Sequence, residues 1–176
     1  MNENSRITLE RDAGVILSFG ISSFVIGYFS LQLSIGSAPV FDPRDILVAC
    51  AGALAGPVGG GLVGFLAGIG GSEPLVPVLL YTLGGILTGF IARALVAEKK
   101  WVPGAALGLG ISYPLVGLFM MATGLWDRIA ALAFQSLVML FTCILVLSII
   151  QSLDPHIFSW SDDRGKTSAD SLMQER

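Results

Sequence analysis

Residues 41–71 read FDPRDILVACAGALAGPVGGGLVGFLAGIGG. Glycine recurs every four residues along this stretch, at positions 52, 56, 60, 64 and 68. Residues four apart share one face of a helix, and a face without side chains lets another backbone approach closely, which is how helices often pack inside membranes. We therefore expect the rest of the chain to pack against this glycine face.

The dipeptide Gly56-Pro57 divides the stretch into two apolar segments, 46–56 and 58–70. Each segment is too short to cross the ~30 Å hydrocarbon core of a bilayer when it is straight. Two conformations are open: one long helix kinked at Pro57, or two short helices joined by a tight turn at Gly56-Pro57.

The composition is that of an integral membrane protein, since 53% of the 176 residues are hydrophobic and 13% are charged. A net charge of −3 argues against a nucleic-acid partner. Further apolar spans are predicted at residues 13–35, 75–96, 102–124 and 129–151. With the two segments above, they predict an all-α integral membrane protein, a compact bundle of six transmembrane helices with glycine-rich close packing, and five spans as the alternative.

The predicted domain organisation is one membrane domain, residues 1–153, followed by a polar cytoplasmic tail, residues 154–176. Six spans with both termini in the cytoplasm put eight of the ten Lys and Arg residues on the cytoplasmic side and leave Arg44 and Arg128 outside. Five spans divide the same charges seven to three. The distribution of positive charge therefore favours six spans slightly.

Six spans would also bring Asp42, Arg44 and Trp126 to the outer ends of the helices, with Tyr81 and Gln135 each about 9 Å below them. Tyr81 and Trp126 could stack on a planar ring, Gln135 could read its edge, and Arg44 could meet an anionic group. These five residues form the predicted substrate-binding site.

Each of these residues also has a purely structural interpretation. Asp42 and Asp45 could cap the helix that begins near residue 46, since a helix N-terminus favours negative charge. Trp126 could be an interfacial anchor, and Tyr81 could be a packing residue. Gln135 has the weakest such alternative, because an amide inside a span needs partners in the protein interior.

The sequence contains no pattern typical of an enzyme or a metal site. There is no Ser-His-Asp set, the single histidine is His156, and Cys50 and Cys143 lie far apart within predicted spans. A carrier coupled to protons or ions usually has a charge at mid-membrane, and none is predicted here. We therefore expect neither catalysis nor a cofactor, and expect either a capture subunit energised by other chains or a sensor or scaffold subunit.

The motif at residues 42–46, Asp-Pro-Arg-Asp-Ile, followed by Gly-Pro-Val-Gly-Gly at 56–60, resembles the substrate-capture (S) components of energy-coupling factor transporters, closest to their riboflavin-type branch. Arg44 stands where that branch usually has serine, and Leu47 where it has proline. The resemblance implies a six-helix subunit in the plasma membrane of a prokaryote that captures a vitamin-like small molecule, flavin as the first guess. Its partners would be a membrane-embedded transporter subunit and two ATPase subunits.

In that family, an alanine-xxx-alanine face of the first helix docks on the membrane partner. The matching positions here are Gly14, Ser18 and Ser22, whose small side chains follow one another at four-residue spacing. The resemblance therefore implies that these three residues form the partner interface. Packing inside this protein is the alternative.

Phe41, Asp42 and Arg44 followed by Gly-Pro also resemble the membrane receptor module of Lyt-type sensor kinases, which has five spans. This second resemblance implies a sensor or scaffold subunit without transport activity. Because no kinase or cyclase sequence follows residue 153 here, such a module is expected to signal through another chain.

Overall fold

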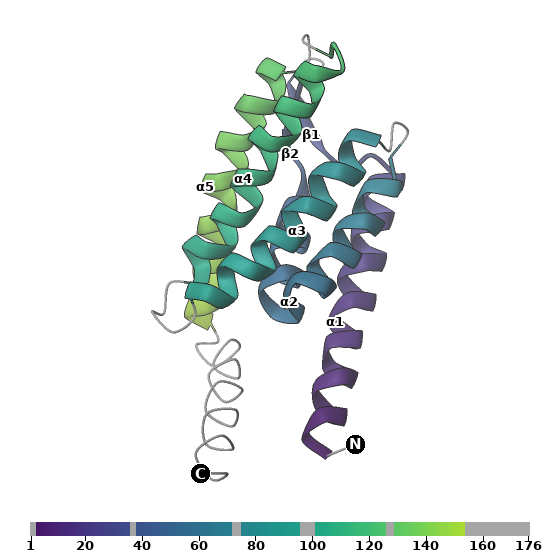
Figure 1. Ribbon diagram of the computed structural model, residues 1–176, viewed down its shortest axis with the longest axis vertical. Helices are drawn as coiled ribbons and strands as arrows, with labels where there is room; N and C mark the ends of the chain where they lie inside the picture. The colour runs from purple at the N-terminus through teal and green to yellow at the C-terminus, as the bar shows by residue number, and fades with distance from the viewer. Residues whose placement is uncertain (1–2, 36–37, 72–74, 96–100, 126–128, 154–176) are drawn as a thin grey trace.

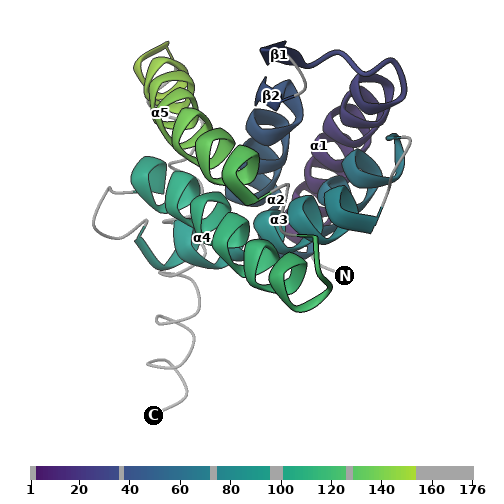
Figure 2. The ribbon, with the colours of Figure 1, turned by 90° about the horizontal axis from the view of Figure 1, so that it is seen from above.

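The computed structural model describes residues 3–35, 38–71, 75–95, 101–125 and 129–153. The elements in chain order are α1 (Glu3–Tyr28), β1 (Leu33–Ile35), β2 (Ala38–Phe41), α2 (Pro43–Ile69), α3 (Leu75–Leu95), α4 (Trp101–Ala122) and α5 (Ile129–Leu153). The helices form a bundle, and the short hairpin of β1 and β2 lies near the end opposite the N-terminus (Figure 1). Seen along the bundle, α4 and α5 lie on one side and α1 on the other, with α2 and α3 between them (Figure 2).

The chain is an all-helical, multi-pass membrane protein. Four of its helices, α2, α3, α4 and α5, are long and apolar enough to cross a bilayer, and α1 contributes a shorter apolar segment, Asp12–Tyr28. The predicted spans at 75–96, 102–124 and 129–151 correspond to α3, α4 and α5 with small differences at their ends. The predicted tail, residues 154–176, lies outside the described residues.

Helix α2 changes direction at Gly56, which has φ of 75° and ψ of −168°. A positive φ is accessible to glycine without steric cost, whereas a residue with a Cβ resists it. Pro57 follows directly, and it both disfavours a helical conformation of the residue before it and lacks an N–H for a helical hydrogen bond. The Gly-Pro pair therefore breaks the helix at this position.

The two halves of α2 run back alongside one another after this break. Arg44 Nη1 donates a hydrogen bond to the carbonyl oxygen of Ala67 at 2.9 Å, although the two residues are 23 positions apart. In a straight helix they would be about 35 Å apart. A Cβ added to Gly60 would also lie 2.7 Å from the Cα of Gly52. Of the two conformations that the sequence leaves open, the structure has the tight turn.

The described residues contain five helices and not the predicted six. Segments 46–56 and 58–70 belong to one element because the helical conformation fails at a single residue, Gly56, with no loop between the halves. The two predicted short helices are therefore present as the two halves of α2, joined directly at the break, and the corrected count is five helical elements.

The glycines of α2 allow its backbone to contact that of α3. A Cβ added to Gly64 would overlap the carbonyl of Tyr81, and one added to Gly68 would overlap the backbone of Val78. Gly85 of α3 faces the Gly60 carbonyl in the same way. Close approach of backbones maximises van der Waals contact between helices where there is no water to drive them together. The glycine face therefore holds α3 against both halves of α2.

The first span is shorter than the predicted 13–35. Helix α1 ends at Tyr28, and Ser30 adopts a positive φ of 52° as the chain turns. Residues 33–35 are instead the strand β1, which pairs antiparallel with β2, Leu33 opposite Phe41 and Ile35 opposite Ala38. The prediction was wrong here because the apolar character of residues 31–35 fits a strand as well as a helix.

Candidate functional site

A buried polar cluster lies where α2 begins, and its centre is Asp42. Asp42 is the N-cap residue of α2, and its side chain accepts a hydrogen bond from the backbone N–H of Arg44 at 3.0 Å. The same carboxylate accepts from the Tyr81 hydroxyl of α3 at 2.8 Å. Only 1% of Asp42 is exposed. One carboxylate therefore caps α2 and also joins it to α3.

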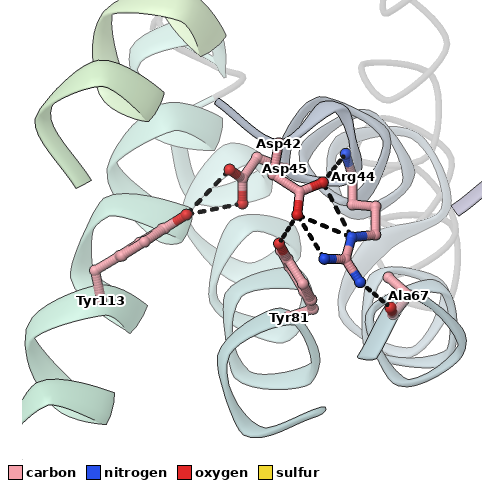
Figure 3. Close-up of polar contacts among 6 residues, drawn as sticks. All are labelled: Asp42, Arg44, Asp45, Ala67, Tyr81 and Tyr113. Atoms are coloured by element: carbon pink, nitrogen blue, oxygen red, sulfur yellow. Dashed lines mark hydrogen bonds and ion pairs between the residues drawn. The ribbon is translucent and has the colours of Figure 1, made fainter. Parts of the chain in front are cut away.

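The counter-charge of Asp42 is the guanidinium of Arg44. Arg44 Nε lies 3.0 Å from both carboxylate oxygens of Asp42, and Nη2 lies 2.6 Å from Oδ2. Nη1 donates to the Ala67 carbonyl of the second half of α2, and the guanidinium carbon lies 4.9 Å from the centre of the Tyr81 ring. Arg44 thus binds both halves of α2 to each other and to α3 (Figure 3).

A second carboxyl group, that of Asp45, connects α2 with α4. Its two oxygens are each 3.0 Å from the hydroxyl of Tyr113, which lies 68 residues further along the chain. Asp45 and Tyr113 are both buried, with 2% and 1% of their surface exposed. Figure 3 shows this pair beside the contacts of Asp42, so the cluster reaches three helices. We call Asp42, Arg44, Asp45, Tyr81 and Tyr113 the polar cluster.

Charges are rare inside membrane bundles, because removing an ion from water costs several kcal/mol unless it is paired and hydrogen-bonded. The polar cluster contains two carboxyl groups and one guanidinium within an apolar bundle. Ionisable residues in such positions commonly mark binding or switching sites. The cluster is therefore the candidate functional site of the chain.

The structure brings together three of the five residues predicted to bind substrate, Asp42, Arg44 and Tyr81. The anionic group that Arg44 contacts is the carboxylate of Asp42, which belongs to the protein and not to a ligand. Gln135 is buried on α5, and among the described residues its side chain is not hydrogen-bonded to the cluster. Trp126 lies outside the described residues. Ligand binding by these five residues stays a prediction.

Two members of the cluster were not selected from the sequence. For Asp45, helix capping was favoured at least as much as ligand contact, so it was left out of the predicted site, and Tyr113 was not singled out. The available signal was that a tyrosine hydroxyl inside an apolar run needs a hydrogen-bond partner when it is buried. The identity of that partner depends on how α4 packs against α2, which sequence spacing does not reveal.

The predicted partner interface lies on the outside of α1. Gly14, Ser18 and Ser22 are exposed, whereas Gly20 and Gly27 of the same helix pack against α2, Gly27 beside the Arg44 side chain. The three small residues therefore do not pack within the described part of this protein. Their contact with a partner stays a prediction. No group of three or more His, Cys, Asp or Glu residues that could hold a metal occurs in that part of the chain.

Residues 1–153 match the family described as 5TMR of 5TMR-LYT, the membrane sensor module of LytS-type sensor kinases. The chain belongs to this family. The match covers all five helices of the 5TMR-LYT module. No curated protein and no solved structure matches the chain.

Membership of the 5TMR-LYT family overturns the assignment to the S components of energy-coupling factor transporters. Capture of a vitamin for uptake, and association with a transporter subunit and two ATPases, were implied by that resemblance and are withdrawn with it. The two motifs that led to that assignment are short. Asp-Pro-x-Asp forms a helix cap and Gly-Pro forms a helix break, and different membrane proteins can use both. The finding supports the alternative function, a membrane receptor module.

Proposed function

We propose that this chain is the receptor module of a membrane signalling system, and that the polar cluster is the element on which the signal acts. The observation that carries the proposal is the burial of two carboxyl groups and one guanidinium where α2, α3 and α4 meet. A signal that changes any of these contacts changes how the three helices pack, because buried polar groups left without partners are costly. The proposal assigns no catalytic reaction to the chain.

The proposed arrangement in the membrane follows from the two halves of α2. Each half has about 13 residues and a length of about 20 Å, which is too short to cross the hydrocarbon core. Helix α2 therefore enters the bilayer with its first half and returns to the same side with its second half. Helices α3, α4 and α5 then cross the membrane in the same directions as in the six-span prediction. By the distribution of Lys and Arg, we place the polar cluster toward the outside of a prokaryotic plasma membrane and both termini in the cytoplasm.

A small molecule is the proposed signal, with Asp42, Arg44 and Tyr81 as its first candidate contacts. These side chains already satisfy one another, so a ligand must replace one of their hydrogen bonds. Binding of this kind is coupled to helix packing, as a receptor requires. A ligand shifts the equilibrium between two packing states only if its affinity for them differs, and a ligand that replaces a hydrogen bond of the cluster has such a difference.

A chimeric kinase tests the receptor proposal. Residues 1–153 are joined to the kinase region of a LytS-type sensor kinase in place of its own membrane module, and autophosphorylation is measured in membranes. Tyr81→Phe removes the hydroxyl that donates to Asp42 with little change in shape, and such a bond to a charged group is worth about 1.5–3 kcal/mol. We expect this variant to change autophosphorylation by about threefold or more.

The matched control is Tyr28→Phe, because Tyr28 of α1 is 68% exposed. It should leave autophosphorylation unchanged. If the output is the same with residues 1–153 as with an unrelated membrane anchor, and Tyr81→Phe has no effect on it, the receptor proposal is wrong.

A further inference from the structure

The polar cluster contains one more acidic group than basic group. The guanidinium of Arg44 makes three contacts with Asp42 and a fourth with the Ala67 carbonyl, so its hydrogen-bonding edges face these two partners. Asp42 in addition accepts from a backbone N–H and from Tyr81. Asp42 and Arg44 therefore form a balanced ion pair, and among the residues that the structure describes Asp45 has no cation of its own.

Within the described residues, the hydrogen-bond partner of the Asp45 side chain is the hydroxyl of Tyr113 alone. One phenol is a poor substitute for water around a carboxylate, and an ion with incomplete pairing is strongly disfavoured in a protein interior. The N-terminus of α2 offsets part of this cost, because Asp45 lies in its first turn, but that interaction is weaker than the cost of burying the charge. The remaining imbalance favours a positive charge or a proton at Asp45.

A proton fits the geometry. A protonated carboxyl group both donates and accepts, as a phenol does. Each Asp45 oxygen lies 3.0 Å from the Tyr113 hydroxyl, so the carboxyl O–H can donate to Tyr113 Oη, or the phenol can donate to the carboxyl. With the proton on Asp45, the five side chains have no net charge.

We propose that Asp45 is a proton-binding site that controls the contact between α2 and α4. The carboxyl is neutral while it pairs with Tyr113. When α4 separates from α2 and water enters, the O–H bond of Asp45 breaks and the proton passes to water, which leaves a solvated carboxylate. Packing of α4 on α2 and uptake of one proton are then the same event.

The other titratable or charged groups that act on Asp45 come from four helices. Asp42 and Arg44 lie on α2, Tyr81 on α3, Tyr113 on α4 and Cys143 on α5. Arg44 favours a charged Asp45, but its own contacts are with Asp42 and Ala67. The inference is independent of the receptor proposal, because it concerns the protein alone and holds whatever the module signals to.

Infrared spectroscopy of the purified chain in lipid nanodiscs at neutral pH tests the proposal. A protonated carboxyl has a C=O stretching band separate from the carboxylate bands, and exchange into D₂O shifts it. We expect the wild type to show this band, Asp45→Asn to lose it entirely, and Tyr113→Phe to keep it at a shifted frequency because the hydrogen bond is lost. The control Asp12→Asn, at a partly exposed position of α1, should leave the band unchanged.

A wild-type spectrum without the band overturns the proposal, whether Asp45 is then a bare carboxylate or holds a metal cation. A band that persists in Asp45→Asn also overturns it, since the proton would belong to another group. If Asp45→Asn does not fold, wild-type protein with isotope-labelled aspartate carboxyls shows whether the band belongs to an aspartate, and its shift in Tyr113→Phe assigns it to Asp45.

Discussion

Gly85→Ala is expected to destabilise the bundle strongly. The added Cβ would overlap the carbonyl carbon and oxygen of Gly60, and these are backbone atoms that cannot rotate away as a side chain can. To admit the methyl group, α3 would have to move off the second half of α2, with loss of the neighbouring contacts at Gly52 and Gly64. We expect a loss of about 3 kcal/mol or more in the free energy of unfolding, at the upper end of overpacking effects.

The measurement is thermal unfolding in detergent, together with size-exclusion chromatography. Gly110→Ala is the matched control, because a Cβ at Gly110 of α4 would find its nearest neighbour, a Leu140 methyl group, at an ordinary distance of 3.5 Å. That variant should unfold like the wild type or slightly later, since alanine is the better helix former. Equal stability of Gly85→Ala and the wild type would contradict the close packing of α2 and α3.

The second large effect is expected for Arg44→Ala. The substitution removes the counter-charge of Asp42 and leaves a carboxylate, 1% exposed, with one backbone N–H and one phenol as donors. It also removes the donor to the Ala67 carbonyl, which joins the two halves of α2. Breaking a buried ion pair from one side typically costs about 3–5 kcal/mol. We expect a loss of this size in the free energy of unfolding.

Two companion variants separate charge from geometry. Arg44→Lys keeps the charge but not the planar fork that contacts Asp42 and Ala67 together, so we expect it to recover only part of the lost stability. The double variant Asp42→Asn with Arg44→Met removes both charges and should be more stable than Arg44→Ala alone. If Arg44→Ala changes the unfolding free energy by less than about 1 kcal/mol, the ion pair does not hold α2 together.

Much of the architecture could be predicted from the sequence because apolar runs of membrane length are a strong signal. The positions of α3, α4 and α5 were predicted to within a few residues, and so was the glycine face of α2. Hydropathy could not separate the strand at 33–35 from a continuation of α1, because an apolar segment this short fits either structure. The tight turn at Gly56-Pro57 was one of the two conformations that the sequence left open. Because the break is confined to Gly56, the two predicted helices form one element, which makes five helices and not six in the described part of the chain.

Only part of the candidate site could be predicted, because sequence spacing reveals near neighbours but not how distant helices pack. Asp42 and Arg44 are near neighbours in the sequence, and Tyr81 lies six residues after Leu75, where α3 begins. The pairing of Asp45 with Tyr113 spans 68 residues and requires α4 to lie beside α2, a packing arrangement that spacing does not contain. The function depended on a motif short enough to resemble two families, and the match over residues 1–153 decided between them.

The central claim is that α2 doubles back at Gly56, so that both of its ends meet in the polar cluster on one side of the membrane. Single cysteines at Gln32, Gly71 and Ala94, in a background with Cys50→Ala and Cys143→Ala, can be labelled in intact cells with a membrane-impermeant thiol reagent. A side chain fits at Gly71, where the nearest atoms would lie 3.9 Å from a Cβ. We predict that positions 32 and 71 are labelled from outside and that position 94 is labelled only after permeabilisation. Labelling of positions 32 and 71 from opposite sides would show that α2 crosses the membrane as one continuous helix and would contradict the account.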